Sequence, residues 1–307
     1  MSEKILVTGG CGFVGANLVP KLLNKGYDVT VFDNLSNGHE EYLKGYNIEI
    51  VKGDIRERDS IKSAMEGFDY CIHLAAFGTV IDSIKNPYDN FEVNVRGTLN
   101  VLQACVDNNI KKMVFSSTGG AIMGNTPPPV NEETVRRPIS PYGASKACCE
   151  VYCNAFSESY GLPTVMLRFA NVYGPFSGHK KGAATAFVKS ALNRDYITIY
   201  GDGSASRDFL YTEDLCNGII MALQTNVPPG SIYHLASGRE TSIKELAEKT
   251  LEISGNNSEI KYLPSRRGEV DKNFADYSKA KAELGFMPKY SLEEGLKLTI
   301  KWFKDNS

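Results

Sequence analysis

The feature that most constrains the fold is a glycine-rich stretch, TGGCGFVG, which begins at Thr8 directly after a short apolar run. Gly9, Gly12 and Gly15 follow a G-x-x-G-x-x-G spacing, and a second apolar run ends at Asp33. Glycine is needed where an anion approaches bare backbone N–H groups at the N-terminus of a helix. Strand, glycines, helix and second strand in this order predict a dinucleotide-binding βαβ unit rather than only a tight turn.

The acid that ends the second strand indicates which dinucleotide binds. A carboxylate at Asp33 accepts both hydroxyls of the adenosine ribose and repels a 2′-phosphate, so the sequence predicts NAD rather than NADP. Asp54 follows the third predicted strand in the stretch KGDIR. It is either a partner for the adenine amino group or the N-cap of a helix over Arg56–Ala64.

Short β-branched or aromatic-rich runs alternate with stretches of helix length through the first half of the chain. Strands that are apolar almost throughout are buried on both faces, which predicts a Rossmann-type α/β fold with a doubly wound parallel sheet. Pro20 falls inside the first predicted helix, where it removes a hydrogen bond, and we expect it on the exposed side. The expected strands cover residues 5–8, 29–33, 48–51, 70–74, 113–116 and 164–169, and two of the expected helices cover 94–106 and 147–160.

After about residue 170 the alternation weakens, and clusters of Gly, Pro and polar residues become frequent. We expect residues 1–170 to form an NAD-binding domain. Residues 171–307 are expected to form mainly a smaller substrate-binding lobe over the carboxyl edge of the sheet, with segments that return to the sheet. Expected helices in this part lie near residues 212–223, 242–253 and 292–303.

Composition excludes several classes of partner. The chain has 34 basic and 36 acidic residues and a net charge of −2, so we expect neither nucleic acid nor an anionic membrane as a partner. No apolar stretch approaches the roughly 20 residues of a membrane helix, and no carboxylate–histidine set indicates a metal. The seven cysteines show no paired spacing, which favours free thiols and a cytoplasmic location.

A second motif, SPYGASKACCE, places Tyr142 and Lys146 four residues apart and so on one face of a helix. A phenol titrates near about 10 and needs a nearby cation to act as a base at neutral pH. Lys146 and a positive nicotinamide ring would supply that charge. With the hydroxyls of Ser116–Thr118 at the end of an earlier strand, the pair predicts a catalytic triad of Thr118, Tyr142 and Lys146.

The chain resembles, from end to end, the extended short-chain dehydrogenase/reductases, and within them the NAD-dependent nucleotide-sugar epimerases and dehydratases. The resemblance is carried by TGGCGFVG, DNLSNG, GDIR, HLAA, NVRGT, SSTGG, PYGASK, RFANVYGP, GDGSASRDFLYTEDL and RRGEVDKNFADYSKA. It implies that Tyr142 transfers the proton, Thr118 bonds to a sugar hydroxyl and Lys146 holds the nicotinamide ribose. It implies NAD contacts at Gly9, Gly12, Phe13, Val14, Gly15, Asp33, Asn34, Asn37, Gly38, Asp54, Ile55, Leu74, Ala75, Ala76, Asn94, Ser116, Tyr142, Lys146 and Phe169.

The same resemblance implies a UDP-sugar substrate and a homodimer formed through the helices that follow strands four and five. It places the diphosphate ligands at Asn171, Arg207 and Arg266, and guanidinium groups match phosphate oxygens well. Asn273 corresponds to a position that is a bulky tyrosine in some UDP-galactose 4-epimerases, so an N-acetylated hexosamine also fits. The charged run His179–Lys181 is either a further phosphate contact or, as we expect for a run of loop charges, solvated. His73 and His234 are expected to be structural histidines with satisfied hydrogen bonds.

Gly119 and Gly120 narrow the reaction. Relatives that eliminate water carry an acid pair after the hydroxyl residue, and decarboxylases usually carry a glutamate there. With glycines, Tyr142, Thr118 and the nicotinamide remain, which suffice to move a hydride from C4 and return it to the other face. We therefore expect a UDP-hexose 4-epimerase of the UDP-glucose/UDP-galactose type. Met123 stands where many relatives have tyrosine, which changes either the shape of the pocket or the activity.

Other activities stay open at this stage. Within the family they are a UDP-N-acetylhexosamine or UDP-glucuronate 4-epimerase, a UDP-glucuronate decarboxylase, another nucleotide-sugar dehydratase, or a ketoreductase. The glycine pair argues against the decarboxylase and the dehydratase, and Asp33 argues against a reductase that uses NADPH. From a different class, a non-catalytic NAD-binding protein would keep the same fold.

Overall fold

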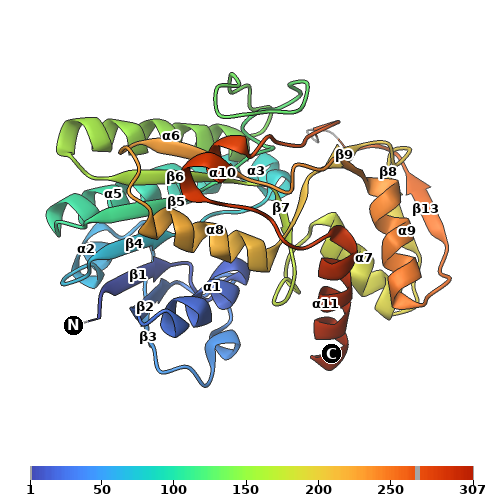
Figure 1. The fold of residues 1–307 in the computed structure, drawn as a ribbon, viewed down its shortest axis with the longest axis horizontal. Coiled ribbons are helices and arrows are strands. Elements are labelled where there is room, and N and C mark those ends of the chain that lie inside the picture. The colour runs from blue at the N-terminus through green and yellow to red at the C-terminus, as the bar shows by residue number, and fades with distance from the viewer. Residues whose placement is uncertain (1, 267–269, 307) are drawn as a thin grey trace.

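The computed structural model describes residues 2–266 and 270–306, and its centre is a seven-stranded parallel sheet (Figure 1). All six strands predicted from the first half of the chain belong to it. The seventh, β11, comes from the second half and forms one edge, in the order β11-β6-β5-β4-β1-β2-β3. The strands are β1 Lys4–Thr8, β2 Asp28–Asp33, β3 Glu49–Lys52, β4 Tyr70–His73, β5 Lys112–Thr118, β6 Thr164–Phe169 and β11 Ser231–Leu235.

The strand order creates a switch point between β1 and β4. From β1 the chain moves outward through β2 and β3, and it then returns to pair β4 with the other side of β1. Thr8 lies opposite both Phe32 and His73, so the segments after these three strands leave the sheet at the same carboxyl edge. Open α/β sheets bind their ligands at this kind of position.

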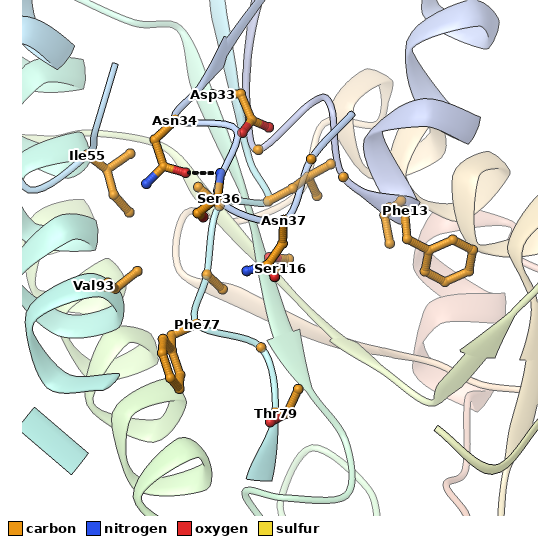
Figure 2. A pocket seen from close by; sticks show the side chains of 18 of the residues that line it. Phe13, Asp33, Asn34, Ser36, Asn37, Ile55, Phe77, Thr79, Val93 and Ser116 are labelled. Carbon is orange, nitrogen blue, oxygen red and sulfur yellow. Dashed lines mark hydrogen bonds between the residues drawn. The ribbon is translucent and has the colours of Figure 1, made fainter. Parts of the chain in front are cut away.

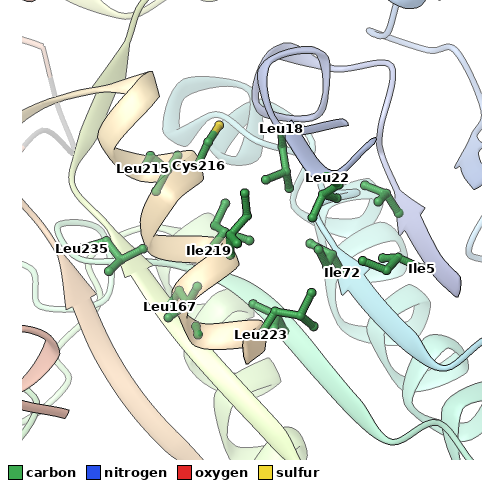
Figure 3. Close-up of a cluster of buried hydrophobic side chains, with 14 of the residues drawn as sticks. Ile5, Leu18, Leu22, Ile72, Leu167, Leu215, Cys216, Ile219, Leu223 and Leu235 are labelled. Carbon is green, nitrogen blue, oxygen red and sulfur yellow. The ribbon is translucent and has the colours of Figure 1, made fainter. Parts of the chain in front are cut away.

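Both faces of the sheet are covered by helices. On one face, α1, α8 and α10 bury an apolar cluster in which Leu22 of α1 and Ile219 of α8 face Ile5 and Ile72 of the strands (Figure 3). On the other face, a second cluster is formed with α2, α5 and α6. Pro20 is half-buried and does not interrupt α1. These helices are α1 Phe13–Asn24, α2 Arg58–Ala64, α5 Gly97–Asp107, α6 Pro141–Tyr160, α8 Thr212–Gln224 and α10 Ser278–Leu284.

A separate apolar cluster lies in a smaller lobe, on the right of Figure 1, where α7, α9 and α11 lie on one side of the parallel pair of β8 and β13. Its elements are α7 Ala183–Leu192, β8 Ile197–Tyr200, α9 Ile243–Ser254, β13 Ile260–Leu263 and α11 Leu292–Asp305. The helix expected near residues 212–223 exists as α8, but it packs on the sheet and not in this lobe.

Short elements connect the larger ones. They are η1 Glu40–Leu43, α3 Val80–Lys85, α4 Pro87–Phe91, η2 Glu92–Arg96, β7 Asn171–Tyr173, β9 Ser206–Arg207, β10 Phe209–Tyr211 and β12 Thr241–Ser242. Over the described ranges 2–266 and 270–306, every helix is too short or too polar to cross a membrane.

Candidate active site

A cavity of about 310 Å³ opens at the carboxyl edge of the sheet, over the switch point (Figure 2). It is bounded by the segments that follow β1, β2, β3 and β4, by the end of β5, and by α6. Of the residues expected to contact NAD, it is lined by Gly9, Gly12, Phe13, Val14, Asp33, Asn34, Asn37, Gly38, Asp54, Ile55, Leu74, Ala75, Ala76, Ser116, Tyr142, Lys146 and Phe169.

The glycines allow backbone to approach backbone at the start of α1. Gly9 has φ +70°, and a Cβ placed on it would lie 2.6 Å from the backbone nitrogen of Ala75. Gly12 is the N-cap of α1 and brings no capping side chain, and the first turn of the helix carries no acid. The N–H groups and the positive end of the helix dipole therefore face the cavity without a protein anion.

Asp33 is held in a fixed orientation by two backbone donors. The N–H of Cys11 donates to its Oδ2 at 3.0 Å, and the N–H of Leu35 donates to its Oδ1 at 2.8 Å. Burial raises the pKa of Asp33, and these two hydrogen bonds oppose that rise. Each carboxylate oxygen keeps a further lone pair, so Asp33 can still accept hydroxyls at the cavity wall.

Asp54 is not a helix N-cap. Helix α2 starts at Arg58 with Glu57 before it, whereas Asp54 accepts from Nε and Nη2 of Arg56 at 3.0 and 2.7 Å. Asn34 donates to the same carboxylate at 2.9 Å. The hydrogen bonds from Arg56 lower the pKa of Asp54 to about 2, so it stays ionised on the cavity wall.

Gly15 and Asn94, both expected to contact NAD, do not line the cavity and instead support the backbone that does. A Cβ on Gly15 would collide with the backbone of Gly10, so this glycine permits the close turn. The amide oxygen of Asn94 accepts from the N–H of Phe77 at 2.7 Å, and its nitrogen donates to Ser145 Oγ at 2.9 Å. Asn94 thereby ties the loop after β4 to α6.

Helix α6 begins at Pro141, six residues before the expected start at residue 147, and therefore carries both Tyr142 and Lys146. The Ser140 hydroxyl accepts from the N–H of Gly143, and Pro141 occupies the first turn. Tyr142, one residue later, hydrogen-bonds with Thr118 at the end of β5. One turn further along, Lys146 donates from Nζ to the carbonyl of Ser116 at 2.8 Å.

Electrostatics at this triad differ from the expectation. Burial raises the pKa of Tyr142 to about 12, although the hydrogen bond with Thr118 lowers it. Burial lowers the pKa of Lys146 to about 8, and its ammonium lies 4.6 Å from the centre of the Phe115 ring. Burial thus outweighs the hydrogen bond with Thr118, and Lys146 is not among the groups that shift the phenol pKa. The positive charge of an oxidised nicotinamide is the remaining source of a lowered phenol pKa.

Comparison with known proteins identifies the family of the chain. Residues 5–236 match the NAD dependent epimerase/dehydratase family. The chain belongs to that family. It is 36% identical over 99% of both chains to a putative UDP-glucose 4-epimerase of Methanocaldococcus jannaschii.

Two solved structures share the whole fold. One is a UDP-glucose 4-epimerase of Thermotoga maritima with UDP-glucose, with 38% identity, a TM-score of 0.95 and 99% of each chain covered. The other is a UDP-N-acetylglucosamine 4-epimerase of Methanobrevibacter ruminantium in complex with UDP-N-acetylmuramic acid, with 34% identity, a TM-score of 0.94 and 100% of each chain covered. This family uses NAD, and the glycine turn, the oriented Asp33 and the uncapped α1 fit that cofactor.

In this epimerase/dehydratase chain, the glycine pair after Thr118 is closely packed. A Cβ on Gly119 would lie 3.2 Å from Nδ1 of His234 and 3.3 Å from the carbonyl of Phe169. A Cβ on Gly120 would lie 3.2 Å from Oδ1 of Asn273. A side chain at either position would require these neighbours to shift by a few tenths of an ångström, and the glycines present supply no second acid or base at the end of β5.

A buried ion pair joins β6 to α6. Nη2 of Arg168 lies 2.8 Å from a carboxylate oxygen of Glu150, and both side chains are almost fully buried. Ser117 and Arg136 donate to the same carboxylate at 2.7 and 3.0 Å. These hydrogen bonds hold the pKa of Glu150 below its usual range despite its burial. The network fixes the strand that carries Thr118 relative to α6.

The remaining expected substrate ligands lie outside the cofactor cavity. Nη1 of Arg207 donates to the carbonyls of Ser206 and Asp271 at 2.7 and 3.1 Å. The guanidinium carbon of Arg266 lies 3.4 Å from the centre of the Tyr200 ring, at the end of β8. Asn171 is exposed, and its own backbone N–H donates to the backbone carbonyl of Asp208.

Asn273 is the expected substrate residue that reaches the catalytic strand, through Gly120. Its side chain is buried, and its Nδ2 finds no hydrogen-bond partner among the residues that the structure describes. Met123 is fully buried in a small apolar cluster with Ile122 and Val130 and does not line the cavity.

Several cavity-lining residues were absent from the sequence prediction. Phe77, Gly78 and Thr79 directly follow the HLAA motif, so continuing that motif would have found them. The run His179–Lys181 lines the cavity as well and is not simply a solvated loop. Its proximity depends on how the second lobe folds back, and the local sequence carries no sign of that. No set of three or more His, Cys, Asp or Glu side chains within residues 2–266 and 270–306 is arranged to hold a metal.

Proposed function

We propose that this chain is a UDP-hexose 4-epimerase that interconverts UDP-glucose and UDP-galactose. The observation that carries the proposal is the glycine pair Gly119–Gly120, packed against His234 and Asn273 beside the Thr118–Tyr142 hydrogen bond. Beside Thr118 the site offers one proton-transferring group, Tyr142 of α6, and the two glycines supply no second one. Elimination and decarboxylation in related enzymes use an additional acid at this place, whereas inversion at C4 does not.

The chain's own residues divide the work. Thr118 orients the sugar hydroxyl, and Tyr142 takes its proton as C4 is oxidised and returns it afterwards. Lys146, ionised near neutral pH, holds the nicotinamide ribose. NAD, when bound, accepts the C4 hydride and gives it back to the opposite face of the 4-keto sugar. Because the cofactor is regenerated in each cycle, the reaction needs no added oxidant or reductant.

Substrate binding is assigned to the second lobe. Asn171, Arg207 and Arg266 are proposed to hold the UDP diphosphate, since guanidinium groups form paired hydrogen bonds with phosphate oxygens. UDP is supported by the relatives whose structures contain UDP-glucose or UDP-N-acetylmuramic acid. An N-acetylhexosamine is the second candidate substrate, because Asn273 is small and buried where a tyrosine would crowd C2.

Purified protein without added cofactor is incubated separately with UDP-glucose, UDP-N-acetylglucosamine and UDP-glucuronate, and products are followed by proton NMR. We expect UDP-galactose from UDP-glucose. Formation of only the N-acetylated 4-epimer would select the second candidate, and a pentose product from UDP-glucuronate would identify a decarboxylase. Release of NAD on denaturation with no conversion of any sugar would indicate a non-catalytic NAD-binding protein.

A homodimer in the cytoplasm is part of the proposal. Of the apolar positions expected at the interface, Val101, Leu102 and Phe156 are buried in the core, whereas Val151 and Tyr152 are exposed on α6. The neighbouring α4 exposes its aromatic residues too, which supports pairing through α4 and α6. Sedimentation velocity tests the dimer. Seven cysteines without a disulfide support a reducing compartment.

A further inference from the structure

The loop that joins β7 to α7, residues 174–182, is fastened to the sheet side of the molecule at both of its ends. Near its start, the Asn17 amide on α1 donates to the carbonyl of Pro175 at 3.0 Å. Near its end, Nζ of Lys181 lies 2.9 and 3.1 Å from the two carboxylate oxygens of Asp82 on α3. Because Asp82 and Lys181 both line the cofactor cavity, the loop runs along its wall.

The middle of the loop is held by aromatic contacts. The ring of Phe176 lies 5.0 Å from Tyr42 of η1 and 5.0 Å from Trp302 of α11, centre to centre. The ring of His179 lies 5.9 Å from that of His39. The loop therefore joins the segment after β2 to the second lobe, and the dinucleotide site lies beneath it.

Lys180 is placed over the N-terminus of α1. Its Nζ lies 5.7 Å from the centre of the Phe13 ring, and Phe13 is the first residue of that helix. Lys180 is exposed as a residue and lines the cavity wall. Desolvation of its ammonium group lowers the pKa of Lys180. An ammonium and an uncapped helix N-terminus that face the same space both favour an anion between them.

His179 provides an independent sign of a ligand. Its Nδ1 is buried and lacks a hydrogen-bond partner in the part of the chain that the structure describes, and the residue lines the same cavity. Burial and the adjacent Lys180 lower the pKa of His179, so its ring is neutral near pH 7. A buried ring nitrogen without a partner is unfavourable unless a bound molecule supplies one.

We propose that Lys180 binds the diphosphate of NAD from the second-lobe side, opposite the N–H groups of α1, and that loop 174–182 is a strap that retains the cofactor between turnovers. Lys146 is engaged with Ser116 at the nicotinamide end of the cavity, and Lys181 is paired with Asp82. Lys180 thus supplies the charge at the diphosphate, and His179 adds a donor. The proposal rests on the dinucleotide site and is independent of the sugar that is epimerised.

The test compares ligands that differ only in what they place beneath the strap. Binding of NAD, ADP-ribose and adenosine to the full-length chain is measured by calorimetry for the wild type and for Lys180→Met. The fraction of purified protein that carries NAD is measured after denaturation. Loss of one charged hydrogen bond predicts a dissociation constant about tenfold to hundredfold higher for NAD and ADP-ribose. Adenosine, which has no phosphate, should bind equally well to both proteins.

Three further variants control the result. Lys180→Arg keeps the charge and should stay within a few-fold of the wild type, whereas Lys301→Met removes an exposed lysine of the same lobe and should change nothing. Lys181→Ala removes the fastening to Asp82 and should speed NAD dissociation about twofold to fivefold, as expected for an exposed ion pair. The proposal is overturned if Lys180→Met binds NAD within twofold of the wild type, or if it weakens adenosine as much as NAD.

Discussion

At the cofactor end of the site, Gly9, Asp33 and Leu74 extend three adjacent strands of one sheet, all within the first 75 residues. At the sugar end, Gly120 meets Asn273 and Gly119 meets His234, contacts that join residues more than 100 positions apart. The first arrangement follows from strand register alone. The second depends on long-range packing, because His234 belongs to β11 at the edge of the sheet and Asn273 to the segment that leads to α10.

The two ends also differ in how their polar groups are satisfied. Asp33 and Asp54 each accept hydrogen bonds on both carboxylate oxygens from backbone or side-chain donors. By contrast, the buried side-chain atoms without a hydrogen-bond partner in the described residues all belong to residues after position 170. They are Nδ1 of His179, Oγ1 of Thr212, Nδ1 of His234 and Nδ2 of Asn273. His179 and Asn273 lie in loops of the second half of the chain and have unpaired atoms that a ligand can bond to, whereas Thr212 and His234 belong to α8 and β11 at the sheet.

The largest effect is expected where the two ends meet. Tyr142→Phe removes the proton-transferring phenol but keeps the ring, so turnover of UDP-glucose should fall by about 10²–10⁴-fold while the bound NAD content stays unchanged. Tyr160→Phe, on the same helix but exposed, is the control and should keep full activity. Steady-state kinetics and cofactor analysis measure both. Undiminished turnover of Tyr142→Phe would show that another group is the base.

The next largest effect separates close packing from backbone conformation at the cofactor end. Gly9 and Gly67 both have positive φ. A Cβ on Gly9 would collide with the backbone of Ala75, whereas a Cβ on Gly67 would have no atom within 4 Å. Gly67→Ala should cost about 1–2 kcal/mol of folding free energy and retain NAD. Gly9→Ala should cost about 1–3 kcal/mol more and lose NAD. Urea unfolding and the content of bound NAD test this. Equal stability and equal NAD content of the two variants would contradict the role of close backbone packing at Gly9.

A third prediction compares a buried histidine from each end. Burial lowers the pKa of both His73 and His234 to about 3. The unfolded chain therefore takes up these protons first as the pH falls below about 6.5, and stability is lost progressively toward pH 3. At pH 5 each histidine should cost about 2 kcal/mol relative to pH 7.

His73→Gln and His234→Gln should each reduce that loss, as measured by urea unfolding at pH 7 and pH 5. The comparison with the wild type cancels the contribution of the carboxylates. An unchanged loss in either variant would mean that the histidine it replaces does not resist protonation in the folded state.

The smallest effect concerns Asn273. Its unpartnered Nδ2 contributes little to stability, so Asn273→Ala should leave the unfolding midpoint almost unchanged while raising KM for the nucleotide sugar about 2–10-fold. Asn108→Ala is the matched opposite, because Asn108 donates to Ala104 and Lys62 far from the site. That variant should lower the melting temperature and leave KM unchanged. A destabilised Asn273→Ala with normal KM would place Asn273 among the structural residues.

Local pattern sufficed for most of the sheet. The short apolar runs predicted as strands in the first half of this chain all form strands. The first glycine turn is recognised from the strand before it and the helix after it. The body of α6 was predicted over 147–160, but its start at Ser140 and Pro141 was missed, although both residues are typical of a helix N-terminus. Strand β11 was not predicted, since its short run lies among Gly and Pro clusters.

The site was less predictable where tertiary placement decides. His179–Lys181 has the composition of a solvated loop, and contacts with residues distant in sequence, such as the ion pair of Lys181 with Asp82, hold it at the cavity. Asp54 and a capping residue look alike in sequence, and the side chain of Arg56 decides between them. His73 has partners on both ring nitrogens, as expected, whereas His234 leaves Nδ1 unpaired because Gly119 lies against it.

Strand β11 is part of the sheet, and helices α8 and α10 pack on it. All three follow α7 and β8, the first elements of the second lobe, in the chain. The polypeptide thus passes between the two parts repeatedly, and neither part is one continuous stretch. Recombination with a relative at a single crossover would give a hybrid sheet as well as a new sugar pocket. Altered sugar preference in this scaffold is therefore most accessible to point substitutions at Gly119, Gly120 and Asn273, which leave the sheet untouched.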